Sequence, residues 1–241
     1  MADTFKNIRV YWLAFIAYWG IILFGYDTGV AGGVVANPFF REYFGLTVNG
    51  EKNQKRIDEV SSNVVSVLQA GAFFGALLSA PVSSKFGRRW TLFAFSVIFV
   101  VGAILTTIAS GSNGLAEIYA GRVISGLGIG GISAVAPAYV SECSPKEVRG
   151  RITGLFQIMV AVGVMLSYFI NFGISLHIKT GEQIWKIPFG FQLVPAGIMC
   201  IGLFTVKARL PLFVALISRT DGMLIRNHHD GSHPLIATRR L

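Results

Sequence analysis

The chain alternates between long apolar stretches and short polar segments. Five stretches contain no Asp, Glu, Lys, Arg or His, and a sixth, 10–36, contains a single charge. The five are 60–84, 90–116, 123–141, 152–176 and 187–206. A helix needs roughly 20 apolar residues to cross a bilayer, and each stretch meets this length. The pattern therefore predicts an all-α, polytopic membrane protein with six transmembrane helices, at residues 10–36, 60–84, 90–110, 114–140, 152–176 and 187–206.

Composition and charge support this prediction. Of the 241 residues, 53% are apolar and 14% are charged, whereas soluble domains carry about 25% charged residues. The net charge of +9 does not indicate nucleic-acid binding, because Lys and Arg gather at the ends of the predicted spans. Ten Lys and Arg fall on the side of the N-terminus and six on the opposite side. The positive-inside rule then predicts a cytoplasmic N-terminus, and the plasma membrane is the expected location.

The sequence changes character after Lys207. Residues 1–207 hold all six predicted spans, whereas residues 208–241 hold scattered Pro and Gly and three histidines, His228, His229 and His233. His-rich segments can bind metal, but the weak patterning favours a disordered tail, which would lie in the cytoplasm after six spans. We therefore expect no metal site and no cofactor.

Two lone charges interrupt the apolar stretches. Asp27 lies about ten residues before the outer end of the first span, and Arg122 about eight residues after the outer start of the fourth. A rise of about 1.5 Å per residue places them roughly 15 and 12 Å deep, so that they can pair. Intramembrane charges usually mark an ion or substrate path. We expect the pair to face one polar cavity and to take part in proton coupling; the alternative is a purely structural ion pair.

Small residues are spaced for close helix packing. Gly71 and Gly75, like Gly126 and Gly130, have the four-residue spacing that lets membrane helices approach. Residues 126–131 also match the G-x-G-x-x-G pattern of dinucleotide-binding folds. That fingerprint requires a strand before it and a helix N-terminus after it, whereas this one lies inside a predicted span, so nucleotide binding is not expected.

Two inner loops carry clustered charges. The segment 84–89 places three cations between the second and third spans, and the segment 137–151 mixes Glu142 with several Arg side chains. Such charges can simply set the topology. They can also form ion pairs between helix ends that hold one conformation and break in another.

Several short motifs occur in a specific order. They are Gly-Tyr-Asp-Thr-Gly at 25–29, Gly-Arg-Arg at 87–89, Gly-Arg at 121–122, the run from Pro137 to Arg151, Gln157, and Trp185 to Gln192. Together they resemble the N-terminal half of the sugar porter family of the major facilitator superfamily, most closely fungal monosaccharide:proton symporters. The resemblance covers about residues 8–207. It implies two three-helix inverted repeats that form the N-terminal bundle of the fold.

The resemblance also implies roles for individual residues. Asp27 matches the acid of proton-coupled members and Arg122 the arginine that pairs with it. Phe24 matches an aromatic that lines the sugar cavity. Gln157 matches an amide that binds sugar hydroxyls, although without the family it could equally be a polar helix-packing residue. The residues that match the intracellular latch of the outward-open state are Gly87, Arg88, Arg89, Glu142, Arg149 and Arg151.

Two departures from the family pattern matter. Ser84 stands where the family usually has an acid, which weakens that part of the latch. After Val206 the chain lacks the family's cytoplasmic linker and six further spans, so we expect a truncated sequence. The implied function is monosaccharide transport, by proton symport. The alternatives are a non-transporting fragment, a half that pairs with a separate C-terminal half, or a membrane sugar sensor; no catalytic arrangement indicates an enzyme.

Overall fold

The computed structural model describes residues 8–48, 51–52, 54–110, 114–144, 146–178 and 181–205. These residues belong to one compact unit, Met1–Thr205. The tail predicted at residues 208–241 lies outside the described residues. The elements of the unit are α2 (Ile8–Ala36), α3 (Pro38–Tyr43), β1 (Thr47–Val48), β2 (Glu51–Lys52), α4 (Gln54–Phe86), α5 (Arg88–Ile108), α6 (Gly114–Cys143), α7 (Lys146–His177), α8 (Gln183–Phe191) and α9 (Leu193–Thr205).

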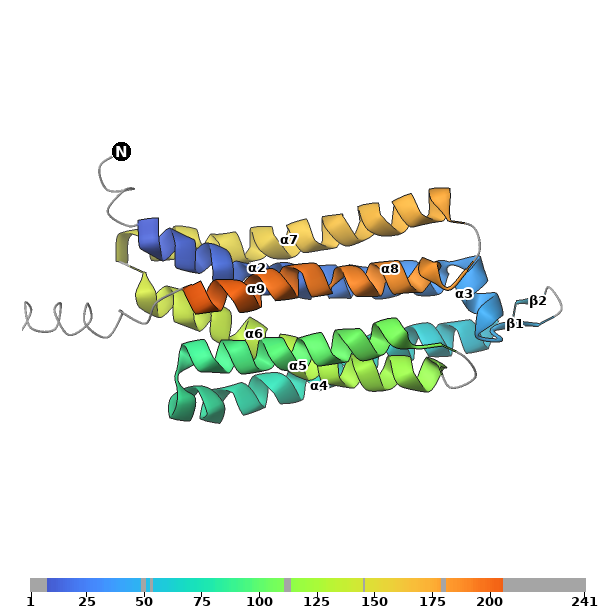
Figure 1. Cartoon of the computed structure of the whole chain (residues 1–241), viewed down its shortest axis with the longest axis horizontal. Coiled ribbons are helices and arrows are strands. Elements are labelled where there is room, and N and C mark those ends of the chain that lie inside the picture. The colour runs from blue at the N-terminus through green and yellow to red at the C-terminus, as the bar shows by residue number, and fades with distance from the viewer. Residues whose placement is uncertain are drawn as a thin grey trace, which may run out of the picture. The chain divides into compact units, whose positions relative to one another are not determined.

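Six helical stretches are long and apolar enough to cross a membrane, as predicted. They lie in α2, α4, α5, α6, α7 and the combined α8–α9. The all-α prediction is confirmed, and the described residues add only a two-residue antiparallel pair, β1 and β2, in the first loop. We call the end of the bundle that carries α3, β1 and β2 the outer end, and the opposite end the inner end (Figure 1).

The sixth span is broken in the middle. A turn at Gln192 separates α8 from α9. Pro195 explains the break, because proline has no N–H to donate to the carbonyl of Phe191 one turn earlier. The span also begins before the predicted residue 187, since Lys186 pairs with Glu182 one turn away and is thereby accommodated at the outer helix end.

The helix contacts follow a pattern of two related halves. The most extensive contacts join α2 to α7, α4 to α6, and α5 to α6, followed by α2 to α6 and to α9. Exchanging the first three spans for the last three converts the α2–α7 contact into α6–α4 and the α5–α6 contact into α9–α2, and it leaves the α2–α6 contact unchanged. A repeat of three spans reverses its direction in the membrane, so this pattern fits the predicted inverted repeats.

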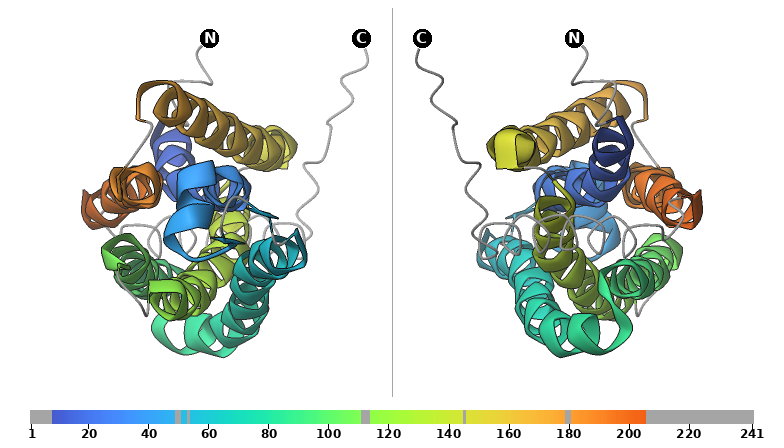
Figure 2. Two further views of the ribbon diagram at one scale, coloured as in Figure 1. Left: turned by 90° about the vertical axis from the view of Figure 1, so that its right-hand side faces the viewer. Right: turned by 90° about the vertical axis from the view of Figure 1, so that its left-hand side faces the viewer.

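Helices α2 and α6, the first helices of the two halves, occupy the middle of the bundle. The apolar stretch of α2 is 72% buried and that of α6 56%, whereas that of α7 is only 17% buried. Viewed end-on, the other four spans surround this central pair (Figure 2). Side chains on the facing surfaces of α2 and α6 are therefore the most enclosed in the protein.

Glycines allow the closest helix approaches. A Cβ added to Gly75 would collide with the backbone of Leu127, and one added to Gly126 with the backbone of Leu68. The close helix approach predicted from the glycine spacing is thus confirmed, and the structure shows that it joins α4 to α6. Gly71 and Gly130 face the opposing backbone in the same way.

A second glycine contact was not predicted. Gly25, Gly29 and Gly33 of α2 are spaced four residues apart and lie against α7, where an added Cβ at Gly25 would meet the backbone of Val160. From α7, Gly163 meets the backbone of α2. The α2–α7 contact is therefore lined by glycines in the same way as the α4–α6 contact. The two contacts occupy equivalent positions when the two halves are compared.

Aromatic side chains fill the outer end of the bundle. Trp185 of α8 is fully buried, and its Nε1 donates to the backbone oxygen of Ala109 over 3.3 Å. Its ring lies 5.4 Å from that of Phe44 and 5.8 Å from that of Phe40. Through these contacts the short helix α3 packs on α8 and joins the first loop to the bundle.

Candidate functional site

Asp27 and Arg122 meet between the two central helices. Arg122 Nη1 donates to Asp27 Oδ1 over 2.5 Å, and each side chain is 1% exposed. The structure thus brings the two predicted residues into contact. Neither residue lines the pocket at Arg89 or the groove at Gly32, and both side chains are almost completely buried. The pair is enclosed by protein, as the central position of α2 and α6 dictates.

A third buried polar residue completes this pair. Gln192 Nε2 donates to the same oxygen, Asp27 Oδ1, over 2.8 Å, and Gln192 is 2% exposed. Its side chain reaches α2 from the turn between α8 and α9. Sequence reasoning assigned Gln192 no role, although it is the only amide in the apolar stretch 187–206 and so could have been singled out. We call Asp27, Arg122 and Gln192 the buried triad.

The buried triad is not fully satisfied. Among the described residues, Asp27 Oδ2 and the Nε and Nη2 atoms of Arg122 have no hydrogen-bond partner. The guanidinium carbon of Arg122 lies 4.9 Å from the centre of the Phe189 ring, which supplies a cation–π contact. Two donors converge on Oδ1, so Oδ2 can take a proton without first losing a protein hydrogen bond.

The two predicted substrate residues lie apart from the triad. Phe24 is half-buried on α2 and Gln157 is exposed on α7. Both helices run toward the outer end, and Gly25 lies level with Val160. Phe24 lies one residue before Gly25, and Gln157 lies three residues before Val160. The heights of Phe24 and Gln157 along the bundle therefore differ by only about 3 Å. They lie on neighbouring helices at one level of the bundle.

One predicted ion pair forms at the inner end. Arg88 donates from Nη2 to Glu142 Oε1 over 2.9 Å and from Nε to Oε2 over 3.4 Å, and its Nη1 donates to Ser83 Oγ over 2.8 Å. Gly87, between α4 and α5, has a φ of 83°, which favours glycine and allows the sharp reversal there. The pair is 39% and 52% exposed. A pair this exposed stabilises by about 0.2–1 kcal/mol, little enough to break in a conformational change.

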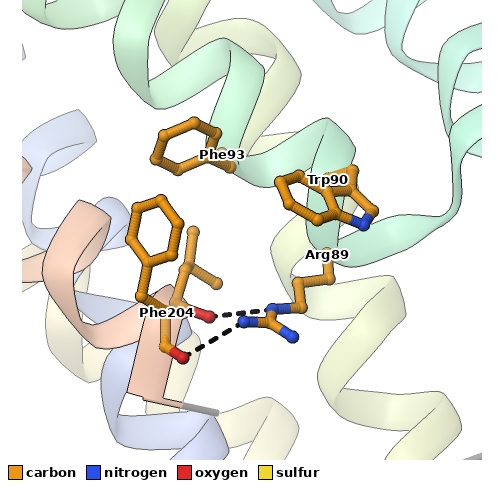
Figure 3. Close-up of a pocket in the computed structure, with 5 residues that line it drawn as sticks. Arg89, Trp90, Phe93 and Phe204 are labelled. Carbon is orange, nitrogen blue, oxygen red and sulfur yellow. Dashed lines mark hydrogen bonds between the residues drawn. The ribbon is translucent and has the colours of Figure 1, made fainter. Parts of the chain in front are cut away.

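The other predicted latch arginines form no ion pair with Glu142 among the described residues. Arg89 does not reach Glu142; its Nε donates to the backbone oxygen of Leu203 over 2.8 Å and its Nη2 to that of Phe204 over 3.2 Å (Figure 3). The last carbonyls of a helix have no intrahelical donor and attract a cation, which explains why Arg89 turns toward the end of α9. Arg151 is exposed, and the side chain of Arg149 lies outside the described residues.

The fold and the central charged site define the class of this protein. The six membrane-spanning helices form two related halves of three helices each, and a buried acid and base lie between these halves. This arrangement is the N-terminal bundle of a major facilitator fold. Solved structures agree. The xylose transporter XylE from E. coli, in a partially occluded inward-open conformation, matches with a TM-score of 0.72 and 23% identity, over 82% of this chain and 50% of that one. The proton:xylose symporter XylE bound to 6-bromo-6-deoxy-D-glucose matches with a TM-score of 0.73 and 22% identity, over 83% and 45%.

The chain belongs to the sugar porters, because the family described as "Sugar (and other) transporter" matches residues 13–208. Curated relatives include a probable quinate permease of Neosartorya fischeri, 39% identical over 83% of this chain, and the quinate permease of Neurospora terricola, 39% identical over 83%. The chain spans 36% and 37% of the lengths of these relatives. It is thus an integral, multi-pass member of a family that transports sugar-like substrates.

Proposed function

We propose that this chain is the proton-coupling half of a monosaccharide transporter that works by proton symport. The observation that carries the proposal is the buried triad, in which a carboxylate and a guanidinium meet deep between the two central helices. Intramembrane acids that can take a proton are rare and usually functional. The family match supplies the sugar-like substrate, and the N-terminus and the inner end are assigned to the cytoplasmic side of the plasma membrane.

Protonation of Asp27 changes the energetics of the triad. While the carboxylate is charged, it holds Arg122 and Gln192 on one oxygen. A proton on Oδ2 removes the negative charge, so the attraction that holds the guanidinium between α2 and α6 weakens. In this proposal the proton arrives from the outer side together with sugar, and the released Arg122 permits the inward transition.

The remaining proposed residues act at two other levels. Phe24 offers an aromatic face, and Gln157 offers two donors and an acceptor, for the sugar at the level just inside the triad. The exposed pair of Arg88 and Glu142, at the Gly87 reversal, acts as the inner latch, with Arg89, Arg149 and Arg151 as its further members. Alternating access requires two bundles that rock around a central site, so the transporting unit includes a second six-helix bundle.

The substitution Asp27→Asn tests the proposal. In the transporting unit that includes the second six-helix bundle, we expect the variant to lose accumulation of labelled sugar against a gradient and to retain exchange of sugar across vesicles, because the amide cannot cycle a proton. Asp58→Asn is the matched control, since Asp58 is an exposed acid at the start of α4 that should not affect uptake. Accumulation at the wild-type level in Asp27→Asn would reject the coupling role.

A second candidate substrate is a carboxylated polyol. Relatives that are 38–39% identical are named quinate permeases. Competition of labelled sugar uptake by quinate at constant pH separates the two substrate classes. The same assay in whole cells identifies a sensor or a non-transporting fragment, because either would bind sugar without accumulating it.

A further inference from the structure

A groove runs between the outer halves of α2 and α7. It encloses a cavity of about 540 Å³ that is partly open to the surface. Small-molecule sites commonly measure about 300–1,000 Å³. The α2 side of the groove is formed by Gly29, Gly32 and Gly33, and a Cβ added to Gly32 would meet no atom within 4 Å. The absence of a side chain at Gly32 therefore leaves open space, whereas Gly29 and Gly33 pack closely against Ser167 and Asn171 of α7.

The α7 side of the groove combines aromatic rings with polar groups. Tyr168 and Phe172 are 75% and 55% exposed, and Asn171 and Ser175 lie between and beside them. Asn171 Nδ2 donates to the backbone oxygen of Ser167 over 2.9 Å, whereas its Oδ1 accepts no hydrogen bond from the described residues. Rings for the apolar face of a sugar and an amide for its hydroxyls are thus both present.

The groove continues the proposed substrate path. Tyr168 and Ser175 follow Gln157 by 11 and 18 residues, and at about 100° per residue both return to within roughly 20° of the same face of α7. On α2, Gly32 follows Phe24 by eight residues, which is about 12 Å further outward and about 80° beyond two full turns. A ligand in the groove would therefore lie outward of Phe24 and Gln157, along the helices that carry them.

Charge selects the kind of ligand. None of the side chains that line the groove carries a charge at neutral pH. A carboxylate that entered would lose part of its hydration without gaining a cation, which is unfavourable, whereas a neutral polyol would exchange water for the amide and hydroxyl groups. We infer that the groove is an outer binding site for a neutral monosaccharide, occupied before the sugar reaches Phe24 and Gln157. This inference rests on the proposed function and names its substrate class.

Filling the groove provides the first test. Gly32→Leu adds a side chain to the groove at a position where an added Cβ meets no atom within 4 Å. Gly173→Leu is the matched control, because Gly173 is also a helical glycine with no atom within 4 Å of an added Cβ, and it lies on the far side of α7 from Tyr168. With the purified chain in nanodiscs, we expect labelled D-glucose to bind at least tenfold more weakly to Gly32→Leu and normally to Gly173→Leu.

Chemical labelling provides a second test that does not depend on the bulky variant. In a background with Cys143→Ser and Cys200→Ser, Gly32→Cys should react with a maleimide from the outer side. We expect saturating D-glucose to slow this reaction at least fivefold and quinate to leave it unchanged. Gly173→Cys should be slowed by neither compound.

The outcomes separate this inference from the proposed function. Unchanged D-glucose binding by Gly32→Leu, or protection of Gly32→Cys by quinate and not by D-glucose, would overturn the groove site and leave the coupling role of Asp27 untouched. A wild-type chain that binds neither compound would also overturn it. Conversely, proton-independent accumulation by Asp27→Asn rejects the coupling role while the groove site stands on its binding data.

Discussion

The structure predicts that the effects of substituting Asp27 and Arg122 on the free energy of unfolding depend strongly on one another. Each side chain is 1% exposed, and they share a hydrogen bond of 2.5 Å. Replacing one partner of a buried pair leaves an uncompensated charge, which costs about 3–5 kcal/mol, whereas replacing both by neutral groups is often close to neutral. Asp27→Asn and Arg122→Gln should therefore each destabilise the chain by about 3–5 kcal/mol.

The double variant should recover most of that loss. Asp27→Asn keeps an oxygen that accepts from Gln192, and Arg122→Gln keeps a donor for position 27. The double variant therefore buries no unpaired charge at these two positions and can keep most of the hydrogen bonds between them. We expect less than about 2 kcal/mol of destabilisation for the double variant, and hence an interaction energy of several kcal/mol in the double-mutant cycle.

Reversible unfolding in mixed micelles, followed by circular dichroism, measures the cycle. The three variants and the wild type are titrated with a denaturing detergent under identical conditions. A second cycle between Asp27→Asn and the exposed Arg151→Gln is the control, and it should be additive within about 0.5 kcal/mol. Additive effects of Asp27→Asn and Arg122→Gln would refute the reasoning, because they would mean that the two charges do not compensate one another.

Three further predictions concern other parts of the fold. Gly25→Leu should prevent α2 from packing on α7 and abolish a folded chain in detergent, as judged by size-exclusion chromatography, because the added side chain strikes backbone. Arg89→Met should speed amide hydrogen exchange at the end of α9 and leave the exchange of α2 unchanged, because only the carbonyls of α9 lose a donor. Hydrogen bonds from Lys186 and from Tyr43 lower the pKa of Glu182 below its ordinary 4.5. Their contribution is therefore present above pH 4.5 and is lost as the pH falls through the lowered value, so Tyr43→Phe should abolish part of any acid-induced loosening of α3 measured by hydrogen exchange.

The sequence was sufficient for features that depend on one helix at a time. A run of apolar residues of membrane length predicts a span whatever surrounds it, and all six spans were found. A charge within such a run is costly wherever the helix packs, so Asp27 and Arg122 could be identified before any contact was known. Their depth could be counted along each helix, and counting placed them at heights that allow a contact.

Contacts that depend on the packing of distant segments were not predicted. Gln192 becomes a donor to Asp27 only because Pro195 breaks the last span and α9 lies beside α2. Arg89 was predicted as a latch residue, but the sequence did not indicate that its guanidinium donates to two carbonyl oxygens at the adjacent end of α9. The four-residue spacing of the glycines at 25, 29 and 33 is visible in the sequence. Only the structure shows that α7 is the helix that packs closely against them.

Helix α6 connects the two sites on which the proposed mechanism depends. It carries Arg122 of the buried triad and Glu142 of the inner ion pair, 20 residues and therefore about 30 Å apart. Pro137 lies between them and removes the hydrogen bond to the carbonyl of Ser133, so the helix can bend near its inner end. In the proposed mechanism, release of Arg122 on protonation would let α6 move as a lever, and the exposed pair of Arg88 with Glu142 is a weak contact that opposes this movement. A buried pair near one end and an exposed pair at the other are therefore what the proposed response of α6 to protonation of Asp27 would require.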